Sequence, residues 1–345
     1  MSSRTGKPGG TGDGSNAAEL AGAAFYCVSS GRFFFGAVAL INTLRLVGHT
    51  EPIFVLDCGL TPAQRELLSA EANVIPALDD STPFLLKTAA PLRHPAKVMV
   101  LIDADIIVTR PLTKLIERTT EDRVAAVEHG QDRFFPEWGK LMGGTARHRR
   151  YVSSSLVLLG GRLGSKVIRL MDEVQGRIEI ERTPYSGPVP DFAFVGGSFS
   201  ETSTDDPFFF ADQDVLNAVL ATEVDPDRVD VLNRTAEAIP PFTGLRVIDE
   251  DMLRCAYEDG TEPYALHHFL PMKPWLEPTF PGVYTQLLVR LLRGGDVAVR
   301  VPPRELPPHL RRGLFAAVRR RSRPVSERFR AVRDRLRSRG DIVGG

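Results

Sequence analysis

The sequence feature that most constrains the fold is the segment KVMVLIDADIIV, residues 97–108, in which Val, Met, Leu and Ile follow one another almost without interruption. A run of this kind is typical of a strand buried on both faces. Strands are also predicted at 24–30 and 52–58, each followed by a helix, at 32–48 and 61–72. This alternation favours an α/β fold, a mostly parallel sheet sandwiched by helices, with its ligand site beyond the carboxyl ends of the strands.

The later part of the chain is less regular. Strands are expected at 151–160, 228–233 and 264–269, and a helix is expected at 212–223. A stretch rich in Gly, Pro and Ser, roughly 183–206, lies among these elements, and a mobile lid is one interpretation of it.

Charge is spread unevenly over the 345 residues, although 43 Lys and Arg residues balance 43 Asp and Glu residues. Residues 300–345 contain 14 Arg, no Lys and 4 acidic residues, so they carry a formal charge of +10 and the preceding residues carry −10. The overall balance argues against a protein whose whole surface binds nucleic acid. We expect a disordered leader at 1–20, one domain at 22–299, and a basic helical C-terminal tail at 300–345.

The tail is open to more than one interpretation. Leu310, Leu314, Phe315 and Val318 share one face of an amphipathic helix with basic residues around it. Such a helix is commonly just solvated. It is also typical of helices that lie on an anionic membrane surface, whereas RNA binding lacks the interleaved aromatic residues that would support it.

Cysteine usage and hydropathy indicate the compartment. Cys27, Cys58 and Cys255 are too few and too scattered for a disulfide framework or a zinc site. The polar N-terminal segment does not match a secretory signal, and no segment approaches the roughly 18 uninterrupted apolar residues of a membrane span. We expect a cytoplasmic protein, with any membrane contact peripheral and at the inner face.

The acidic pair Asp103 and Asp105 ends the apolar segment. In an extended chain, residues two apart point to the same side, so both carboxylates can face one ligand. A divalent cation relieves the repulsion between them, and oxygen ligands suit Mg²⁺ or Mn²⁺. The alternative is that Asp105 merely caps the turn before Arg110 and Pro111.

Two further motifs carry polar side chains next to apolar ones. In HHFLPMKPW, His267 and His268 offer an imidazole ligand, and Lys273 suits a phosphate. In DQD, residues 212–214, the acids are also what a helix N-terminus favours for capping and for its dipole.

Taken in order, the motifs IDAD, YVSSSLVLLG, DQDVLN and HHFLPMKPW resemble those of glycosyltransferase family 8, the retaining, metal-dependent enzymes that include glycogenin and bacterial lipopolysaccharide galactosyltransferases. The resemblance covers about residues 24–299. It implies the GT-A form of a Rossmann-like α/β fold, a nucleotide diphosphate sugar as donor, and Mn²⁺ or Mg²⁺ as cofactor.

The resemblance also implies roles for individual residues. Asp103, Asp105 and His267 would bind the metal, although it does not decide between His267 and its neighbour His268. Lys273 would contact the donor diphosphate, and Lys87 occupies the family's basic donor-binding position.

The donor sugar would meet a second group of residues. Ser153 takes the place of the Asn in the family's Asn-Ala-Gly pattern, Asp212 would hold sugar hydroxyls, and Gln213 would lie against the anomeric carbon. The remaining residues expected to contact the donor are Ser29, Ala104 and Asp214. The sequence departs from the pattern at the first strand, where the usual Asp is missing, at Ser153–Ser155, and at Leu270, which replaces a Gly.

The function implied is transfer of a hexose, from UDP-hexose, to a hydroxyl of a glycan, lipid-linked or cell-envelope acceptor, with retention of configuration. Two alternatives stay open at the level of sequence. One is a phosphohydrolase of the haloacid dehalogenase type that uses Asp103 as nucleophile. The other is a non-catalytic protein that binds sugar nucleotides.

Overall fold

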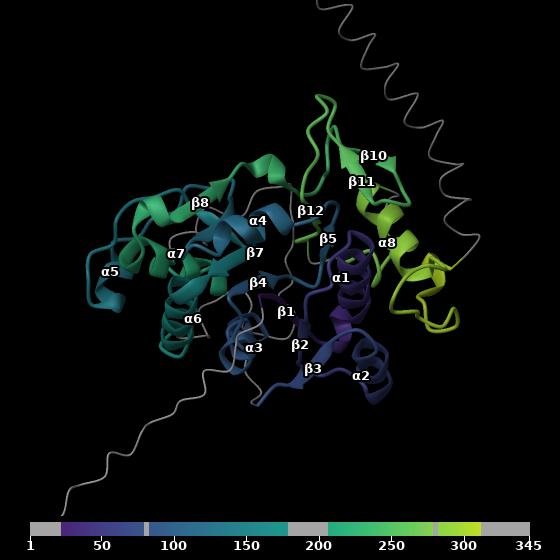
Figure 1. The fold of residues 1–345 in the computed structure, drawn as a ribbon, viewed down its shortest axis with the longest axis horizontal. Coiled ribbons are helices and arrows are strands. Elements are labelled where there is room, and N and C mark those ends of the chain that lie inside the picture. The colour runs from purple at the N-terminus through teal and green to yellow at the C-terminus, as the bar shows by residue number, and fades with distance from the viewer. Residues whose placement is uncertain (1–21, 79–82, 179–205, 271, 279–281, 312–345) are drawn as a thin grey trace, which may run out of the picture.

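The computed structural model describes residues 22–78, 83–178, 206–270, 272–278 and 282–311. Its centre is a seven-stranded sheet of order β3-β2-β1-β4-β7-β6-β8 (Figure 1). The strands are β1 Ala23–Ser29, β2 Ile53–Asp57, β3 Asn73–Pro76, β4 Val98–Ile102, β6 Val124–Glu128, β7 Val152–Gly160 and β8 Val229–Leu232. The predicted leader, the loop at 183–205 and most of the tail lie outside the described residues.

Strand directions confirm the mostly parallel sheet. Strands β1, β2, β3 and β4 are parallel to one another, and β6 is parallel to β8. Only β7 runs antiparallel to the strands on both of its sides within this sheet. Its direction could not be read from composition, because a strand buried on both faces is apolar throughout in either orientation.

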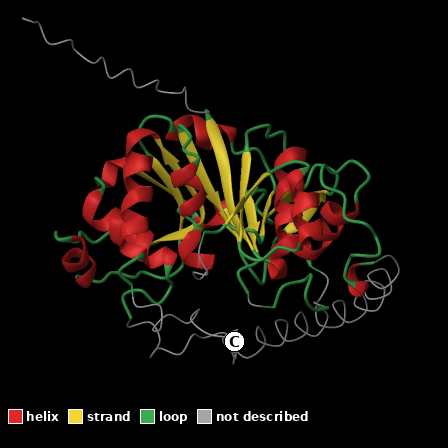
Figure 2. Cartoon of the chain, turned by 90° about the horizontal axis from the view of Figure 1, so that it is seen from below, coloured by secondary structure: helices red, strands yellow, loops and turns green. Residues whose placement is uncertain are grey.

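Helices cover both faces of the sheet, as Figure 2 shows. Alternate residues of one strand reach opposite layers: Phe25 packs in the core beneath α1 and α8, and Tyr26 packs in the core beneath α6 and α7. The helices are α1 Phe34–Leu46, α2 Pro62–Ser69, α3 Ala89–Arg93, α4 Thr113–Thr119, α5 Glu137–Met142, α6 Gly161–Gln175, α7 Asp212–Glu223 and α8 Val283–Arg293. Short 3-10 helices occur at Gly31–Phe33, Pro83–Leu86, Pro226–Arg228, Arg234–Ala236 and Pro308–Leu310.

The apolar segment 97–108 is divided, which corrects the expectation of one extended strand. After β4 the chain turns at 103–105, where the Ile106 amide donates to the Asp103 carbonyl at 3.2 Å. The remainder, β5 Ile106–Val108, joins a small sheet of order β5-β12-β9 with β12 Ala265–His267 and β9 Glu237–Ala238. A separate hairpin is formed by β10 Arg246–Asp249 and β11 Arg254–Ala256. The two aspartates therefore lie in a turn between two sheets.

The packed unit continues past the predicted boundary at residue 299. Val301, Leu306 and Leu310 are buried in the core that contains α1 and α8. Leu310 is thus a core residue and not part of an exposed amphipathic face. Within the described ranges, none of the helices combines the length and the apolar character that a membrane span requires.

Helix α1 begins against the turn that carries the aspartates. A Cβ atom at Gly36 would lie 2.4 Å from the Ala104 carbonyl oxygen and 2.8 Å from Cη2 of Trp275. The Trp275 indole is itself fixed by donating to the Arg32 carbonyl at 2.8 Å. The absence of a side chain at position 36 is what allows the turn to approach the helix this closely.

We expect Gly36→Ala to destabilise the protein. Alanine raises helix propensity by about 1 kcal/mol, but overpacking against a backbone oxygen and a buried indole costs typically about 1–3 kcal/mol. Urea unfolding followed by circular dichroism measures the difference. Gly144→Ala is the control, because nothing lies within 4 Å of a Cβ atom there; equal stability of the two variants would contradict the expectation.

Candidate active site

Two acids and an imidazole from distant parts of the chain meet at one end of the sheet. Asp103, Asp105 and His267 each offer one ligand atom, and these atoms all lie within 4.8 Å of one another. The strand register brings them together: His267 of β12 pairs with Ile106 of β5, the residue that follows Asp105. These three residues can therefore hold one metal ion.

The surroundings of Asp105 support this interpretation. Its Oδ2 lies 2.6 Å from Lys273 Nζ, and its Oδ1 lies 3.4 Å from His267 Nε2. Burial by itself raises the pKa of Asp105, but the Lys273 and His267 cations outweigh that effect and hold the pKa well below its usual range. Oδ1 is buried and receives no hydrogen bond from the described residues. A buried carboxylate oxygen without a donor is what a bound cation would complete.

The second aspartate is linked to helix α7 through a lysine. Lys87 Nζ lies 2.6 Å from Asp103 Oδ1 and 2.7 Å from Asp212 Oδ2, and it also donates to the Ser154 carbonyl at 3.3 Å. Burial raises the pKa of Asp103 to about 6, with repulsion from Asp105 adding to the shift while Lys87 opposes it. Lys87 therefore lies between a candidate metal ligand and the residue expected to hold the sugar.

The two adjacent histidines have different environments. Burial lowers the pKa of His267, but the carboxylates of Asp105 and Glu237 outweigh burial and raise it to about 10. Burial and the nearby Lys273 lower the pKa of His268 to about 4. Only His267 lies with the aspartates in the metal-binding geometry, so it is the candidate ligand.

Glu237 was not predicted from the sequence. Its Oε1 lies 2.6 Å from His267 Nδ1, and its side chain accepts from Ser155 Oγ at 2.8 and 2.9 Å. It is a single acid in the segment TAEAIPPF, where no motif marks it. The feature that marks Glu237 in the structure is its burial, because an acid is seldom as little as 5% exposed unless it is paired. Burial cannot be read from the sequence.

Gln213 is held at both ends of its amide. Its Oε1 accepts from the Ser154 amide at 3.3 Å, and its Nε2 donates to the Tyr151 hydroxyl at 3.1 Å. Tyr151 donates in turn to Asp214 Oδ1 at 2.6 Å. The hydroxyl proton is thus used on a carboxylate, so the Gln213 amide can only donate to Tyr151, and its orientation is fixed.

Asp214 does not have the position predicted for a substrate-binding residue. It is fully buried, and its oxygens are taken up by Tyr151, by the Arg133 guanidinium at 3.2 and 3.1 Å, and by the Phe210 amide at 2.7 Å. We interpret it as a structural residue that supports Tyr151. The DQD motif thus combines two side chains at the site with one that faces the interior.

The remaining predicted residues, Ser29, Ala104 and Ser153, are all buried. Ser29 ends β1 and is 1% exposed; its hydroxyl donates to the Ser30 carbonyl at 3.3 Å. Ala104 is buried in the turn between the aspartates, against Gly36. The Ser153 hydroxyl is also buried and lies 2.7 Å from Ser155 Oγ.

Comparison with known proteins places the fold. No protein-family model and no curated protein matches the chain. A solved active-site mutant of LgtC is 15% identical with a TM-score of 0.51, over 81% of this chain and 97% of that one. The bifunctional glycosyltransferase WbbM is 14% identical with a TM-score of 0.50, over 81% of this chain and 50% of that one. The galactosyltransferase LgtC with donor and acceptor sugar analogues is 15% identical with a TM-score of 0.49, over 79% and 98%.

The first two of these structures, with TM-scores of 0.51 and 0.50, are glycosyltransferases of the family 8 type, with the GT-A fold. The fold expected from the motif resemblance is therefore confirmed: a mostly parallel sheet flanked by helices, with the acidic pair at the carboxyl end of β4. At 14–15% identity the likeness extends to the fold, and the chemistry must be argued from the side chains.

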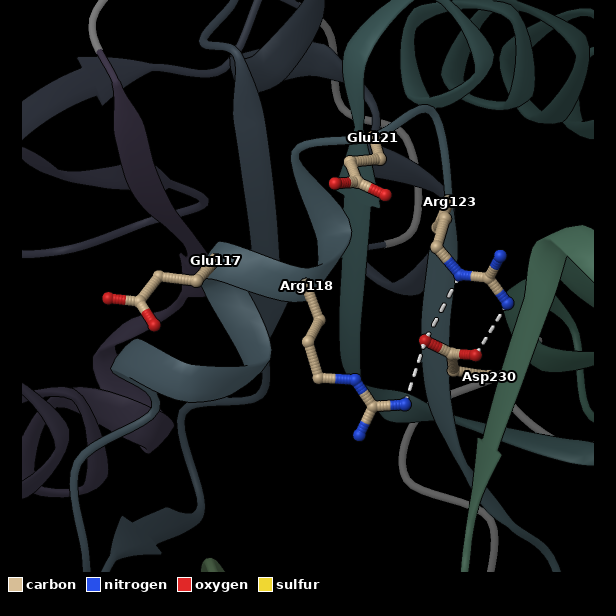
Figure 3. Close-up of a pocket in the computed structure, with 5 residues that line it drawn as sticks. All are labelled: Glu117, Arg118, Glu121, Arg123 and Asp230. Atoms are coloured by element: carbon tan, nitrogen blue, oxygen red, sulfur yellow. Dashed lines mark hydrogen bonds and ion pairs between the residues drawn. The ribbon is translucent and has the colours of Figure 1, made fainter.

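A surface depression elsewhere contains none of the predicted site residues. It is lined by Glu117, Arg118, Glu121, Arg123 and Asp230, and Figure 3 shows Arg118 and Arg123 directed toward Asp230. These ion pairs are partly exposed to solvent, with Arg123 29% exposed. They offer a comparison for the buried pair of Arg133 and Asp214, which are 5% and 0% exposed.

We expect Arg133→Met to destabilise the protein by about 3–5 kcal/mol, because it leaves the Asp214 carboxylate buried without its cation. Arg123→Met is the matched control; the unfolding midpoint should change little, since solvent already screens that pair. Thermal unfolding of both variants measures the contrast. Equal loss in the two variants would refute the structural role of the buried pair.

Proposed function

We propose that this protein is a metal-dependent glycosyltransferase that moves a hexose from a nucleotide diphosphate sugar, most simply UDP-hexose, to an acceptor hydroxyl with retention of configuration. The observation that carries the proposal is the convergence of Asp103, Asp105 and His267 on one point, with Lys273 in contact with it. A cation held beside a buried ammonium places two positive charges together, and this arrangement suits the binding of an anionic diphosphate.

The ligand set favours Mn²⁺, with Mg²⁺ as the alternative, because two carboxylates and one imidazole combine hard oxygen ligands with a nitrogen that Mn²⁺ accepts. Held by these residues, the cation would supply Lewis-acid stabilisation of the leaving diphosphate. Lys273 adds a fixed positive charge at the same place: its ammonium is buried, and it donates to Asp105 and to the His268 carbonyl. Such a charge stabilises a leaving group without reorganisation during the reaction.

The sugar-binding side of the proposal rests on Lys87, Asp212 and Gln213. Lys87 ties Asp212 to the metal-binding turn, which places a carboxylate for sugar hydroxyls next to the proposed cation. The fixed Gln213 amide offers a dipole to the developing positive charge at the anomeric carbon. Every carboxylate described at this site has a cationic neighbour, so none of them is evident as the group that takes the acceptor proton. We therefore propose that the departing phosphate oxygen takes it.

Charge supports a proposal for the acceptor and the place of action. We propose a glycan, lipid-linked or cell-envelope acceptor, reached by a cytoplasmic enzyme at the inner face of the membrane. The support is the excess of arginine in the C-terminal tail, which suits anionic headgroups. Leu310 packs in the core and Arg311 donates to the Leu306 and Arg304 carbonyls, so the part of the tail proposed for the membrane follows Arg311.

We expect purified protein with Mn²⁺ to hydrolyse UDP-hexose slowly, and Asp105→Asn to reduce that rate by at least about a hundredfold, because it removes a metal ligand and unpairs Lys273. Release of UDP measures the reaction, and circular dichroism confirms that the variant folds. Addition of EDTA to the wild type should abolish turnover. Full turnover in EDTA would contradict the role of a metal.

Two further assays distinguish the other two functions. Turnover of p-nitrophenyl phosphate that depends on Asp103 would favour the phosphohydrolase. Binding of UDP-hexose with Mn²⁺, detected as a rise in the melting temperature, without release of UDP in the presence of any acceptor, would favour the non-catalytic binder.

We expect removal of residues 312–345 to abolish binding to vesicles that contain anionic lipid while leaving donor hydrolysis unchanged. Co-sedimentation with vesicles of phosphatidylglycerol and phosphatidylcholine measures the binding, with pure phosphatidylcholine as control. Equal sedimentation of the full-length and truncated chains would exclude the tail as the membrane contact.

A further inference from the structure

The small sheet places an acid behind the imidazole of His267. Glu237 of β9 pairs in parallel register with Ala265 of β12, two residues before His267. Residues two apart on a strand share a face, and paired residues of neighbouring strands share it too. The side chains of Glu237 and His267 therefore meet on one face of this sheet.

Both carboxylate oxygens of Glu237 have hydrogen-bonding partners. Its Oε1 lies 2.6 Å from His267 Nδ1, and Ser155 Oγ lies 2.8 and 2.9 Å from its two oxygens. A hydroxyl has one proton, so Ser155 donates it to the carboxylate and accepts from Ser153 Oγ at 2.7 Å. Glu237 thus has a fixed position on the strand that neighbours the histidine.

This arrangement decides which nitrogen of the imidazole faces the aspartates. A carboxylate accepts hydrogen bonds, so Nδ1 must carry a proton, and Nε2 is the atom 3.4 Å from Asp105 Oδ1. A histidine binds a metal through the lone pair of one ring nitrogen. A carboxylate that accepts a hydrogen bond from the other nitrogen fixes both the tautomer and the orientation of the ring.

Ser155 connects this arrangement to a departure in the sequence. It stands where the motif of the resembling family has glycine, which has no hydroxyl to donate. In this chain the hydroxyl binds Glu237, which is 5% exposed. The serine and the glutamate therefore form one hydrogen-bonded pair behind the histidine.

We propose that Glu237, supported by Ser155, is a positioning residue that holds His267 with Nε2 toward the divalent cation of Asp103 and Asp105. The proposal rests on the metal site proposed above. It extends that site by one carboxylate and one hydroxyl, neither of which touches the cation.

The test is the affinity of the full-length protein for Mn²⁺ alone, measured by isothermal titration calorimetry. We expect Glu237→Ala to weaken binding by about tenfold to a hundredfold. Glu237→Gln should lose less, because its amide oxygen still accepts from Nδ1, and Ser155→Ala should lose less than Glu237→Ala. Melting of the metal-free proteins by circular dichroism shows which variants fold. If Glu237→Ala does not fold, the Mn²⁺ affinities of Glu237→Gln and Ser155→Ala test the proposal.

A matched control lies elsewhere in the chain. His49 Nδ1 is 3.1 Å from Glu51, and His49 Nε2 accepts from the Leu112 amide at 2.9 Å. Each nitrogen of this imidazole therefore has a partner within the protein. Glu51→Gln should leave Mn²⁺ affinity unchanged. An equal loss in Glu51→Gln and Glu237→Gln would assign the effect to general destabilisation and overturn the proposal.

A second measurement reports on the imidazole itself. With Zn²⁺ as a diamagnetic probe, long-range ¹H–¹⁵N spectra should show His267 protonated on Nδ1 and bound through Nε2 in the wild type. Glu237→Ala should lose this single tautomer. Affinity within about twofold of wild type together with an unchanged tautomer would overturn the role of Glu237, whereas a wild type that binds no Mn²⁺ would overturn the metal site and this proposal together.

Discussion

Compensation of buried charge is the constraint on which the site depends. Like charges about 4 Å apart repel by about 4 kcal/mol when the effective dielectric constant is near 20, so acids cannot gather without cations between them. Four carboxylates meet two ammonium groups and one imidazole here: Asp103, Asp105, Asp212, Glu237, Lys87, Lys273 and His267. Lys87 joins two of the acids and His267 joins two others. The same pattern, an excess of acid with ammonium groups beside it, suits a cation bound together with a diphosphate.

The scaffold makes this arrangement possible by ending one strand and starting another within three residues. Strand β4 belongs to the large sheet and β5 to the small one, so the turn at 103–105 projects its carboxylates into the space between the sheets. Gly36 permits the turn to lie against α1, and the Tyr284 hydroxyl and the His268 amide both donate to the Asp105 carbonyl. These contacts fix the backbone of the turn that carries both aspartates.

Much of the fold followed from local patterns. The strands at β1, β2, β4 and β7 and the helices α1, α2 and α7 were predicted because hydrophobic periodicity, capping residues and turn residues are properties of short segments. Thr61, with which the predicted helix at 61–72 begins, forms a capping box with Gln64, a contact between residues only three apart. The division of 97–108 between two sheets, the direction of β7 and the burial of Leu310 were not predicted, because each depends on which distant segment packs alongside.

The sequence by itself determined the kinds of chemical group available, and the order of the acidic pair, DQD and HHFLPMKPW indicated that they act together. Tertiary structure alone decided which of these groups meet. It selected His267 over His268, directed Asp214 into the interior, and brought Glu237 behind the imidazole. The physical reason is that burial, hydrogen-bond direction and distance between charges arise from strand register between segments far apart in the chain, and no local pattern of residues encodes them.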